Sequence, residues 1–176
     1  MPNILEISQL GSSVIRTRAQ EIDDVKAPEI QALIDDMILT CEASKGVGIA
    51  APQVGHSLSL LIMASAPNKR YPNAPLMKPT ALINPRVLSF SEEKDKDWEG
   101  CLSVPGIRAR VPRHRHIEIS YVDQEGCEQH AFFDGFLARL FQHEFDHLIG
   151  KVFIDRVDST EDIITEKEYQ KLMNLL

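Results

Sequence analysis

The chain has 176 residues, of which 43% are hydrophobic and 26% charged, and its formal net charge is -7 at pH 7. This length predicts one domain over residues 1–176 with its own core, and the negative charge argues against nucleic acid as a partner. Three cysteines, an odd count, argue against a disulfide framework.

The N-terminal segment does not have the pattern expected of a targeting signal. The first residues, MPNILEI, form neither the basic nor the apolar part of a leader, and no apolar run approaches the length of a membrane span. We therefore expect a cytoplasmic protein with no membrane partner, and we expect it to be a monomer. In a reducing compartment, a cysteine stays free to bind a metal ion.

The first half of the chain predicts two helices and one strand. Pro28 opens the clearer helix, in which apolar residues recur at helical spacing up to about residue 44. The glycine-rich segment 46–53 is unsuited to a helix, and the four prolines of segment 66–79 indicate a surface loop. The elements expected here are a short helix ending near residue 18, the helix 28–44 and a buried strand 58–63.

The second half predicts short strands and two late helices. A turn sequence at 123–126, DQEG, separates two strand-like segments and indicates a hairpin. The expected strands are 81–83, 86–90, 107–111, 116–122 and 127–133, and the expected helices begin near residue 135 and span 165–176. Antiparallel sheets packed around a late helix, with an amphipathic helix near the N-terminus and a short helix at the C-terminus, indicate an α+β fold.

A run of basic residues lies between positions 108 and 116. It contains Arg108, Arg110, Arg113 and Arg115, together with two histidines. Because the chain as a whole is acidic, we interpret this run as a solvated strand or loop edge.

The most specific local pattern is H-E-x-x-H, formed by His143, Glu144 and His147. On a helix, residues four apart project from one face, so both imidazoles can bind one divalent metal ion. Glu144 then lies beside the metal as a general base without being a ligand. The kind of site depends on the third ligand.

Known metal sites offer three candidates for that ligand. A metzincin site needs a histidine six residues after His147, where this chain has Phe153, so that pattern fails. A thermolysin-like zinc endopeptidase takes a glutamate about twenty residues downstream, where Glu166 lies in the C-terminal helix. Cys101 would complete a Cys-His-His site with one open position, as in catalytic centres. These two alternatives both stay open.

Three segments of the chain form a longer pattern. The first is GVGIAAPQ at 46–53, the second is EGCLS at 99–103, and the third is QHEFDHLIG at 142–150. The glycine-rich segment is a weak signal alone, but the three in this order over most of the chain are specific. In these motifs the chain resembles the peptide deformylase family.

The resemblance implies hydrolysis of the N-formyl group from the formyl-methionine that begins nascent polypeptides. It implies that Cys101, His143 and His147 bind one divalent ion, Fe2+ in the native enzyme, with a water in the fourth position. Zn2+ or Ni2+ fits the same geometry, because ligand identity alone does not select among them. Some bacterial members dock on the ribosome through a long basic C-terminal helix, whereas the tail from residue 158 is short and acidic at its start.

The chemistry and the resemblance together define the catalytic residues. The attacking water must lose a proton, which Glu144 can accept and later deliver to the leaving amine. The carbonyl oxygen gains negative charge, and the resemblance implies that the Gln53 amide and the backbone N–H of Leu102 stabilise it. Because Gln53 and Glu144 are both present, a catalytically silent metal- or peptide-binding relative is the weaker alternative.

Candidate substrate-binding residues follow from their places in the motifs. Gly46, Gly48 and Gly100 leave room for a peptide backbone to approach as an added strand. A methionine side chain needs an apolar pocket beside the metal. The candidates to line it are Val47, Phe136 and Leu140.

Three further residues concern the pocket and the metal helix. In many bacterial members of the family, the position of Arg139 holds an apolar residue that helps to line the methionine pocket. A guanidinium there would narrow the pocket mouth or contact the substrate backbone. Asp146 points away from the metal, and we expect it to pair with Arg113 and so to fix the helix.

Overall fold

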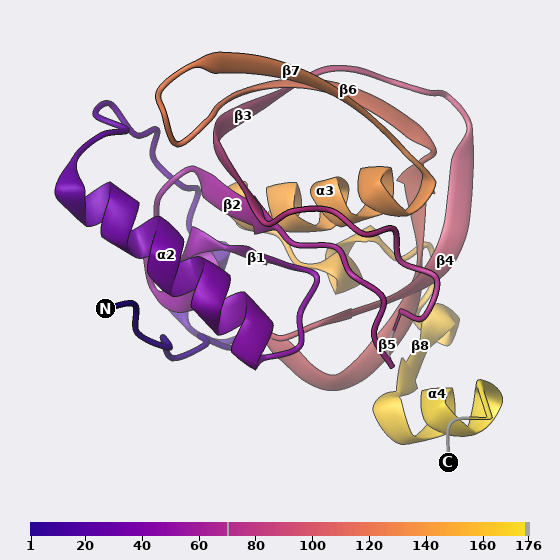
Figure 1. Ribbon diagram of the computed structural model, residues 1–176. Coiled ribbons are helices and arrows are strands. Elements are labelled where there is room, and N and C mark those ends of the chain that lie inside the picture. Colours follow the sequence, from indigo (N-terminus) through magenta and orange to yellow (C-terminus); the bar gives the residue numbers. More distant parts are fainter. Residues whose placement is uncertain (70, 175–176) are drawn as a thin grey trace.

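The computed structural model describes residues 1–69 and 71–174. Two sheets and one long helix between them form most of the fold (Figure 1). The helices are α1 (Ser13–Arg16), α2 (Pro28–Ala43), α3 (Gly135–Leu148) and α4 (Glu166–Leu172). The strands are β1 (Gly48–Ala50), β2 (Leu60–Met63), β3 (Thr80–Phe90), β4 (Lys94–Cys101), β5 (Val104–His114), β6 (His116–Val122), β7 (Glu128–Asp134) and β8 (Ile163–Thr165).

The strands named above pair antiparallel throughout the described ranges. Five of them form one sheet in the order β1-β2-β3-β6-β7, and three form a second sheet in the order β4-β5-β8. The helix α3 packs on β1, β2 and β7 of the first sheet and on β5 of the second. This arrangement confirms the predicted α+β fold with antiparallel sheets around a late helix.

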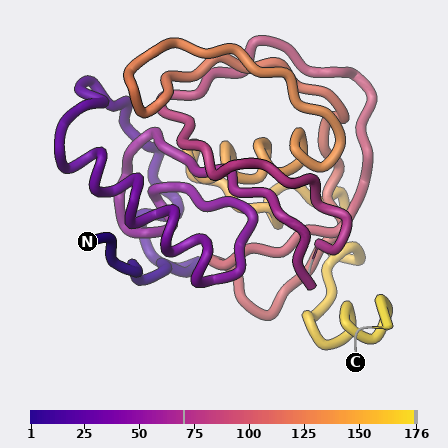
Figure 2. The backbone as a smooth tube through the Cα atoms, viewed as in Figure 1, coloured from indigo at the N-terminus to yellow at the C-terminus, as the bar shows by residue number. Residues whose placement is uncertain are grey.

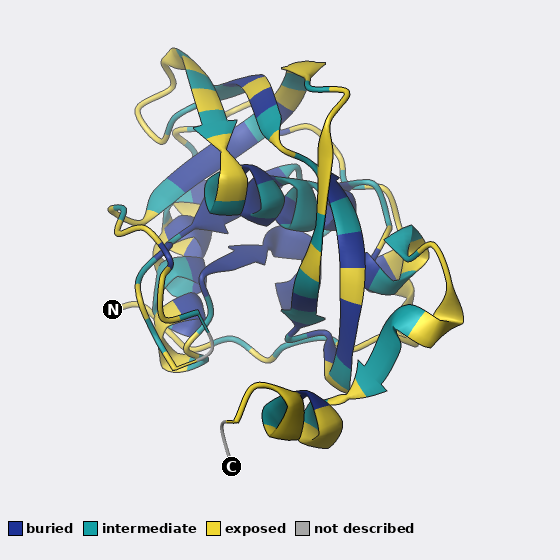
Figure 3. Cartoon of the chain, turned by 90° about the vertical axis from the view of Figure 1, so that its right-hand side faces the viewer, coloured by how far each residue is buried: buried dark blue, intermediate teal, exposed yellow. Residues whose placement is uncertain are grey.

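The position of α3 is set by the apolar core. Ala138 and Phe141 of this helix are completely buried and pack against Leu61, Leu82 and Ile119 of the five-stranded sheet. Burying an apolar side chain of that size contributes roughly 1.5–3 kcal/mol, so rotation of the helix would be costly. The strands behind the helix are buried over much of their length (Figure 3). The core therefore fixes which helical face turns toward the second sheet.

The first half of the chain follows its predicted outline. The helix α2 begins at Pro28 and ends at Ala43, one residue before the expected end, and its apolar face packs on β1 and β2. The segment 46–53 contains no α-helix, because it forms β1 and then enters a short 3-10 turn at Ala51–Val54. The segment 66–79 is a loop in its described part.

Four strands in the second half of the chain differ clearly from prediction. The expected strands 81–83 and 86–90 are one strand, β3, with an irregularity at Asn84, whose φ is 48°. No sequence pattern predicts β4, because this edge strand is mostly charged and lacks apolar alternation. The strand β5 extends beyond 107–111 at both ends, and the three-residue strand β8 is too short to leave a pattern.

The predicted short helices are shorter still. The helix α1 ends at Arg16, two residues before the expected end. The helix α4 covers Glu166–Leu172 of the expected range 165–176, whose last two residues lie outside the described part of the chain. None of the described helices combines the length and the apolar character needed to cross a bilayer.

Residues 8–10 connect the glycine-rich segment 46–53 with the EGCLS segment 99–103 through backbone hydrogen bonds. The backbone N–H of Ser8 donates to the carbonyl of Gln53 at 2.8 Å, and that of Leu10 donates to the carbonyl of Ser103 at 2.8 Å. We call these residues the N-terminal clasp. The N-terminal and C-terminal ends of the trace lie on opposite sides of the view in Figure 2.

Candidate metal centre

Three ligand atoms converge between the two sheets. The helix α3 carries His143 and His147, and Cys101 is the last residue of β4. One ligand atom from each of these residues lies within 4.8 Å of the others, and the Sγ of Cys101 is 3.4 Å from the Nε2 of His147. Among the described residues, this is the cluster that could hold a metal ion. A single divalent ion at its centre can reach all three donors.

The side chain of Glu99 orients the first histidine. Its Oε2 lies 2.8 Å from the Nδ1 of His143, and because a carboxylate only accepts, Nδ1 must be the donor. In the neutral form of the ring, the other nitrogen, Nε2, then carries no proton and can act as a ligand. Arg113 binds the same carboxylate through two hydrogen bonds of 2.9 and 3.0 Å.

The ion pair predicted between Arg113 and Asp146 is present, at 2.7 Å. Both side chains are almost completely buried, so interpreting the whole basic run 108–116 as a solvated edge was wrong for Arg113. Arg156 also binds Asp146, at 2.6 Å. A chain of paired charges therefore runs from His143 through Glu99 to the far side of α3.

The pKa values of the two histidines in the centre shift in opposite directions. Burial opposes charge on His143, but hydrogen bonds to Cys101 and Glu99 raise the pKa of this imidazole well above its usual value. Burial lowers the pKa of His147 well below its usual value, which keeps this ligand neutral. One thiol and two imidazoles form a donor set suited to one divalent cation, which would have to displace a proton from His143.

The side chain of Glu144 lies beside this donor set and is not part of it. The residue is 4% exposed, and its Oε2 has no hydrogen-bond partner among the described residues. Burial raises the pKa of the Glu144 carboxyl to about 7. A Cβ added at Gly48 would lie 2.8 Å from the Oε1 of Glu144, so glycine is what allows β1 to approach the carboxyl.

The amide of Gln53 lies next to the cysteine. Its Nε2 is 3.5 Å from the Sγ of Cys101 and 3.2 Å from the Oγ of Ser103, and its Oε1 accepts from the backbone N–H of Ala50 at 2.8 Å. The backbone N–H of Ser103 also donates to the same sulfur, at 3.4 Å. Two N–H groups are therefore directed at the sulfur of the predicted metal ligand.

A cleft open to solvent leads to the metal-site residues. It is lined by all seven residues predicted to bind substrate, which are Gly46, Val47, Gly48, Gly100, Phe136, Arg139 and Leu140. Gln53, Leu102 and Glu144 line the same cleft. Arg113 and Asp146 lie outside it, as expected of residues that support the helix from behind.

Arg139 does not direct its charge into the cleft. Its guanidinium donates to the Oε1 of Glu99 at 2.8 Å, to the carbonyl of Val111 at 2.8 Å and to the carbonyl of Asp95 at 2.6 Å. The side chain is 12% exposed. Arg139 therefore ties α3 to both strands of the β4–β5 pair, and the stem of its side chain forms part of the cleft wall.

The alternative third ligand, Glu166, lies elsewhere. Its carboxylate binds Arg108, and it is absent from the described cluster of potential metal ligands. Phe153, which occupies the position where a metzincin would carry its third histidine, stacks on His143 with ring centroids 6.1 Å apart. The structure thus favours Cys101.

Three residues of the cleft have no role in the sequence prediction: Tyr71, Trp98 and Glu99. Glu99 belongs to the EGCLS segment, so the motif could have pointed to it. Tyr71 lies in the proline-rich loop and packs edge-on against Phe136, with ring centroids 5.3 Å apart. Nothing in the local sequence indicates that the loop returns to the cleft.

One thiol, two imidazoles and a buried carboxyl at the end of an open cleft define a metal-dependent hydrolase. Residues 4–162 match the model of the family described as polypeptide deformylase. The chain belongs to this family, and it is a metal-dependent amidohydrolase.

Curated relatives and solved structures agree with this assignment. The chain is 53% identical over 172 residues to peptide deformylase 2 of Nostoc sp., which covers 98% of this chain and 96% of that protein. It is 48% identical over 156 residues to peptide deformylase 2 of Pseudomonas putida, with 88% of each chain covered. A class I type b peptide deformylase from Acinetobacter baumannii, solved with Met-Ala-Ser bound, superposes with a TM-score of 0.87 at 38% identity and covers 89% of this chain and 100% of that one.

Proposed function

We propose that this protein hydrolyses the N-formyl group from the N-terminal formyl-methionine of nascent polypeptides and releases formate. The observation that carries the proposal is the convergence of Cys101, His143 and His147 beside the buried carboxyl of Glu144. The cleft that opens onto these residues gives a peptide end access to them. We infer one catalytic domain over residues 1–176.

The metal is proposed to be Fe2+, held by Cys101, His143 and His147, and Zn2+ or Ni2+ suits the same donors. When bound, a divalent ion lowers the pKa of a water molecule and polarises the formyl carbonyl. The buried hydrogen bond from His143 to Glu99 holds the imidazole in the orientation that a ligand requires.

Glu144 is proposed to take the proton of the attacking water. A carboxyl with a pKa near 7 is matched to proton transfer at neutral pH, because it can accept a proton and give it back. Its Oε2, which has no partner among the described residues, is free for this task. The same carboxyl then delivers the proton to the departing amine of the peptide.

Two donors are proposed to stabilise the negative charge that develops on the formyl oxygen. They are the side-chain amide of Gln53 and the backbone N–H of Leu102, which line the cleft on either side of Cys101. Loss of one such donor typically raises the barrier by about 2.7–4 kcal/mol. Gln53 is held by Ala50 and Ser103, so its amide is already in place before the reaction.

The peptide is proposed to bind as an added strand along Gly46, Gly48 and Gly100, where side chains do not block the backbone. The methionine side chain enters a pocket lined by Val47, Phe136 and Leu140. Backbone hydrogen bonds tolerate many sequences, so one pocket for the first residue suits an enzyme that acts on many nascent chains. We place the protein in the cytoplasm as a monomer that meets these chains near the ribosome.

The test is an anaerobic assay of the ferrous protein on formyl-Met-Ala-Ser, with formate release as the readout. Wild-type protein should release formate, and a Glu144→Ala variant with the same iron content should release almost none. No formate from the iron-loaded wild type would overturn the proposal. An endopeptidase would instead cleave an internal bond of an unformylated peptide, and mass spectrometry of the products separates the two reactions.

A further inference from the structure

The guanidinium of Arg108 lies directly against the backbone of the cleft wall. Arg108 is 2% exposed, although its position in a basic run led us to expect a solvated side chain. A Cβ added at Gly100 would lie 2.7 Å from the Nη1 and 2.8 Å from the Cζ of Arg108. Glycine at position 100 is therefore what allows the guanidinium to pack flat against β4.

Gly100 lies at an irregularity of that strand. In the β4–β5 pair, Glu99 is opposite Ala109 and Cys101 is opposite Val104, and the register shifts between them. Gly100 thus has no partner on β5, and its position depends on what packs against it. This residue lines the cleft directly before the cysteine of the metal site.

The helix α4 holds Arg108 in this position. The Nε of Arg108 donates to the Oε2 of Glu166 at 2.5 Å, and its Nη2 donates to the Oε1 at 3.3 Å. The guanidinium carbon also lies 4.7 Å from the ring centroid of Tyr169. A two-point ion pair and a cation–π contact from one helix restrict both the distance and the plane of the guanidinium.

The same helix touches the cleft wall a second time. The ring of Tyr169 packs edge-on against Trp98, with centroids 5.5 Å apart, and Trp98 lines the cleft. The strand β8 joins this region to the fold, because Ile164 pairs with Arg108 on β5. Otherwise α4 stands outside the body, mostly exposed (Figure 3).

We propose that Arg108 is a positioning residue for substrate, through which α4 fixes the Trp98–Gly100 wall of the cleft. The inference deepens the proposed function and rests on it, because Gly100 is one of the residues along which the peptide backbone is proposed to bind. Without Glu166, the charge of Arg108 would be buried with its carboxylate partner missing, and the guanidinium would move away from Gly100. The backbone at Gly100, along which the peptide is proposed to bind, would then be displaced. Cys101, His143 and Glu144 would keep their own contacts.

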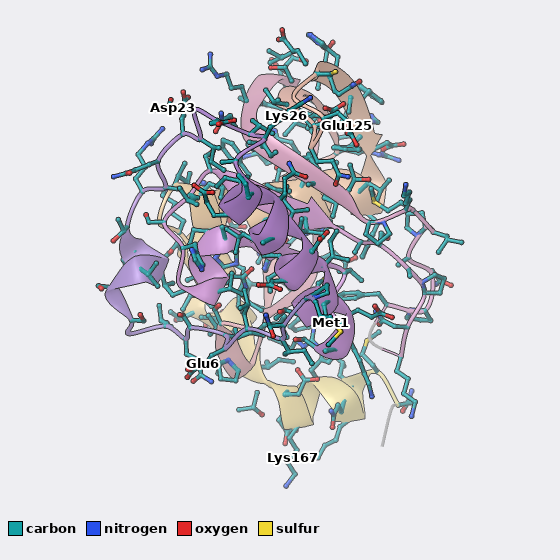
Figure 4. The ribbon with its side chains drawn as sticks, turned by 60° about the vertical axis from the view of Figure 1, so that its left-hand side comes forward. Met1, Glu6, Asp23, Lys26, Glu125 and Lys167 are labelled. Atoms are coloured by element: carbon teal, nitrogen blue, oxygen red, sulfur yellow. The ribbon has the colours of Figure 1, made fainter. Side chains whose placement is uncertain are left out.

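This geometry predicts a separation of binding from chemistry. In Glu166→Gln, we expect KM for formyl-Met-Ala-Ser to rise by about tenfold while kcat stays within about twofold, because binding is lost equally in the ground and transition states. The matched control is Glu168→Gln, whose residue pairs with Lys171 at the exposed surface of the same helix. A second control is Lys167→Gln, because Lys167 points away from the body (Figure 4).

Trp98 supplies a readout that needs no turnover. It is the chain's single tryptophan, so intrinsic fluorescence reports the cleft wall and its contact with Tyr169. Titration with the peptide Met-Ala-Ser should give weaker binding by about tenfold in Glu166→Gln and in Tyr169→Leu, with a changed emission maximum. Tyr169→Phe keeps the ring and should bind the peptide as the wild type does. This control shows whether weaker binding by Tyr169→Leu comes from loss of the ring and not from misfolding.

The proposal fails if Glu166→Gln binds Met-Ala-Ser as tightly as Glu168→Gln, or if its defect is in kcat with KM unchanged. Loss of metal from Glu166→Gln would also overturn it, since Arg108 would then support the metal centre instead. Arg108→Lys keeps the positive charge but loses the planar guanidinium that makes two hydrogen bonds to Glu166. If this variant binds Met-Ala-Ser as tightly as the wild type does, the guanidinium does not have the role proposed here. Absence of formate release by the wild type would refute the proposed function, whereas the fluorescence titration would still measure the coupling of α4 to the cleft.

Discussion

The Nδ1 of His143 lies 2.8 Å from the Oε2 of Glu99, and this contact connects a metal ligand to a buried network of charges. Arg113 and Arg139 bind the same carboxylate, at 2.9 and 2.8 Å. Burial alone would raise the pKa of Glu99, but Arg113 and the hydrogen bond from His143 hold it well below its usual value. The carboxylate therefore stays ionised and keeps the imidazole oriented.

Removal of Arg113 should weaken both the fold and the metal site. Arg113→Ala leaves the buried carboxylates of Glu99 and Asp146 with fewer partners, so we expect the free energy of unfolding to fall by about 3–5 kcal/mol. Metal affinity should fall by about 10–100-fold, because the support of His143 is lost. Chemical denaturation and competition with a chelator measure the two effects. The exposed Arg115, changed to Ala, is the control; an equal loss in both variants would contradict the role of the buried network.

The identity of the third ligand can be read from metal content. Cys101→Ala should leave protein that retains almost no iron after dialysis, because two imidazoles alone hold a divalent ion weakly. Cys127→Ala, which changes an exposed cysteine, should retain a full equivalent. Elemental analysis of anaerobically purified samples gives the answer. Iron retained by Cys101→Ala but lost from Glu166→Gln would restore the endopeptidase alternative.

Glu144 should matter for turnover and not for metal binding. In Glu144→Gln, the amide cannot accept the proton of water, and we expect kcat to fall by about 10²–10⁴-fold. Iron content should equal that of the wild type, because Glu144 is not one of the clustered ligands. Steady-state formate release and elemental analysis on the same samples test this. Near-normal turnover would mean that another group takes the proton.

A methyl group at position 48 should disturb the base without touching the metal. In Gly48→Ala, the new Cβ would lie 2.8 Å from the Oε1 of Glu144 and 2.9 Å from Leu140, so the carboxyl must move. A shift of a catalytic group by about 1 Å lowers the rate of the reaction on the order of 10²-fold. Formate assays on protein of verified iron content provide the measurement. If kcat is unchanged, the carboxyl has more freedom than its burial indicates.

Arg139 should influence which first residue is accepted. Arg139→Leu removes the donors to Val111 and Asp95 and frees that side of the cleft wall. We expect the ratio of kcat/KM for formyl-Phe-Ala-Ser to that for formyl-Met-Ala-Ser to rise by about tenfold, as a wider pocket discriminates less. Thermal unfolding should show a loss of about 1.5–3 kcal/mol from the missing hydrogen bonds. An unchanged ratio would show that the arginine stem does not limit the pocket.

The parts of the site that the sequence predicts are those that local geometry determines. His143 and His147 are brought together by one helical turn, so their spacing is sufficient to predict that they meet. Cys101 is more than forty residues away in the chain, and the family resemblance was needed to settle the choice between it and Glu166. A pairing over that distance depends on how β4 packs against α3, which residue spacing does not encode.

The misinterpreted residues have a common physical origin. Arg108 and Arg113 were read as solvated because charged side chains rarely lie inside proteins, yet both are buried with carboxylates from distant segments. The strand β4 was missed because it lies at the edge of a sheet, where Lys94, Asp95 and Asp97 are exposed and no apolar alternation is needed. In each case the deciding partner belongs to another element, so the signal exists only after the fold has formed.

The N-terminal clasp has a consequence for the order in which the site is completed. Ser8 and Leu10 are synthesised first, yet their partners Gln53 and Ser103 come from the middle of the chain. The two histidines follow only on α3. A nascent chain that has not yet reached residue 147 therefore holds only part of the donor set, and tight metal binding must wait for that residue. An enzyme that processes nascent chains thus cannot act before its own last metal ligand has been made.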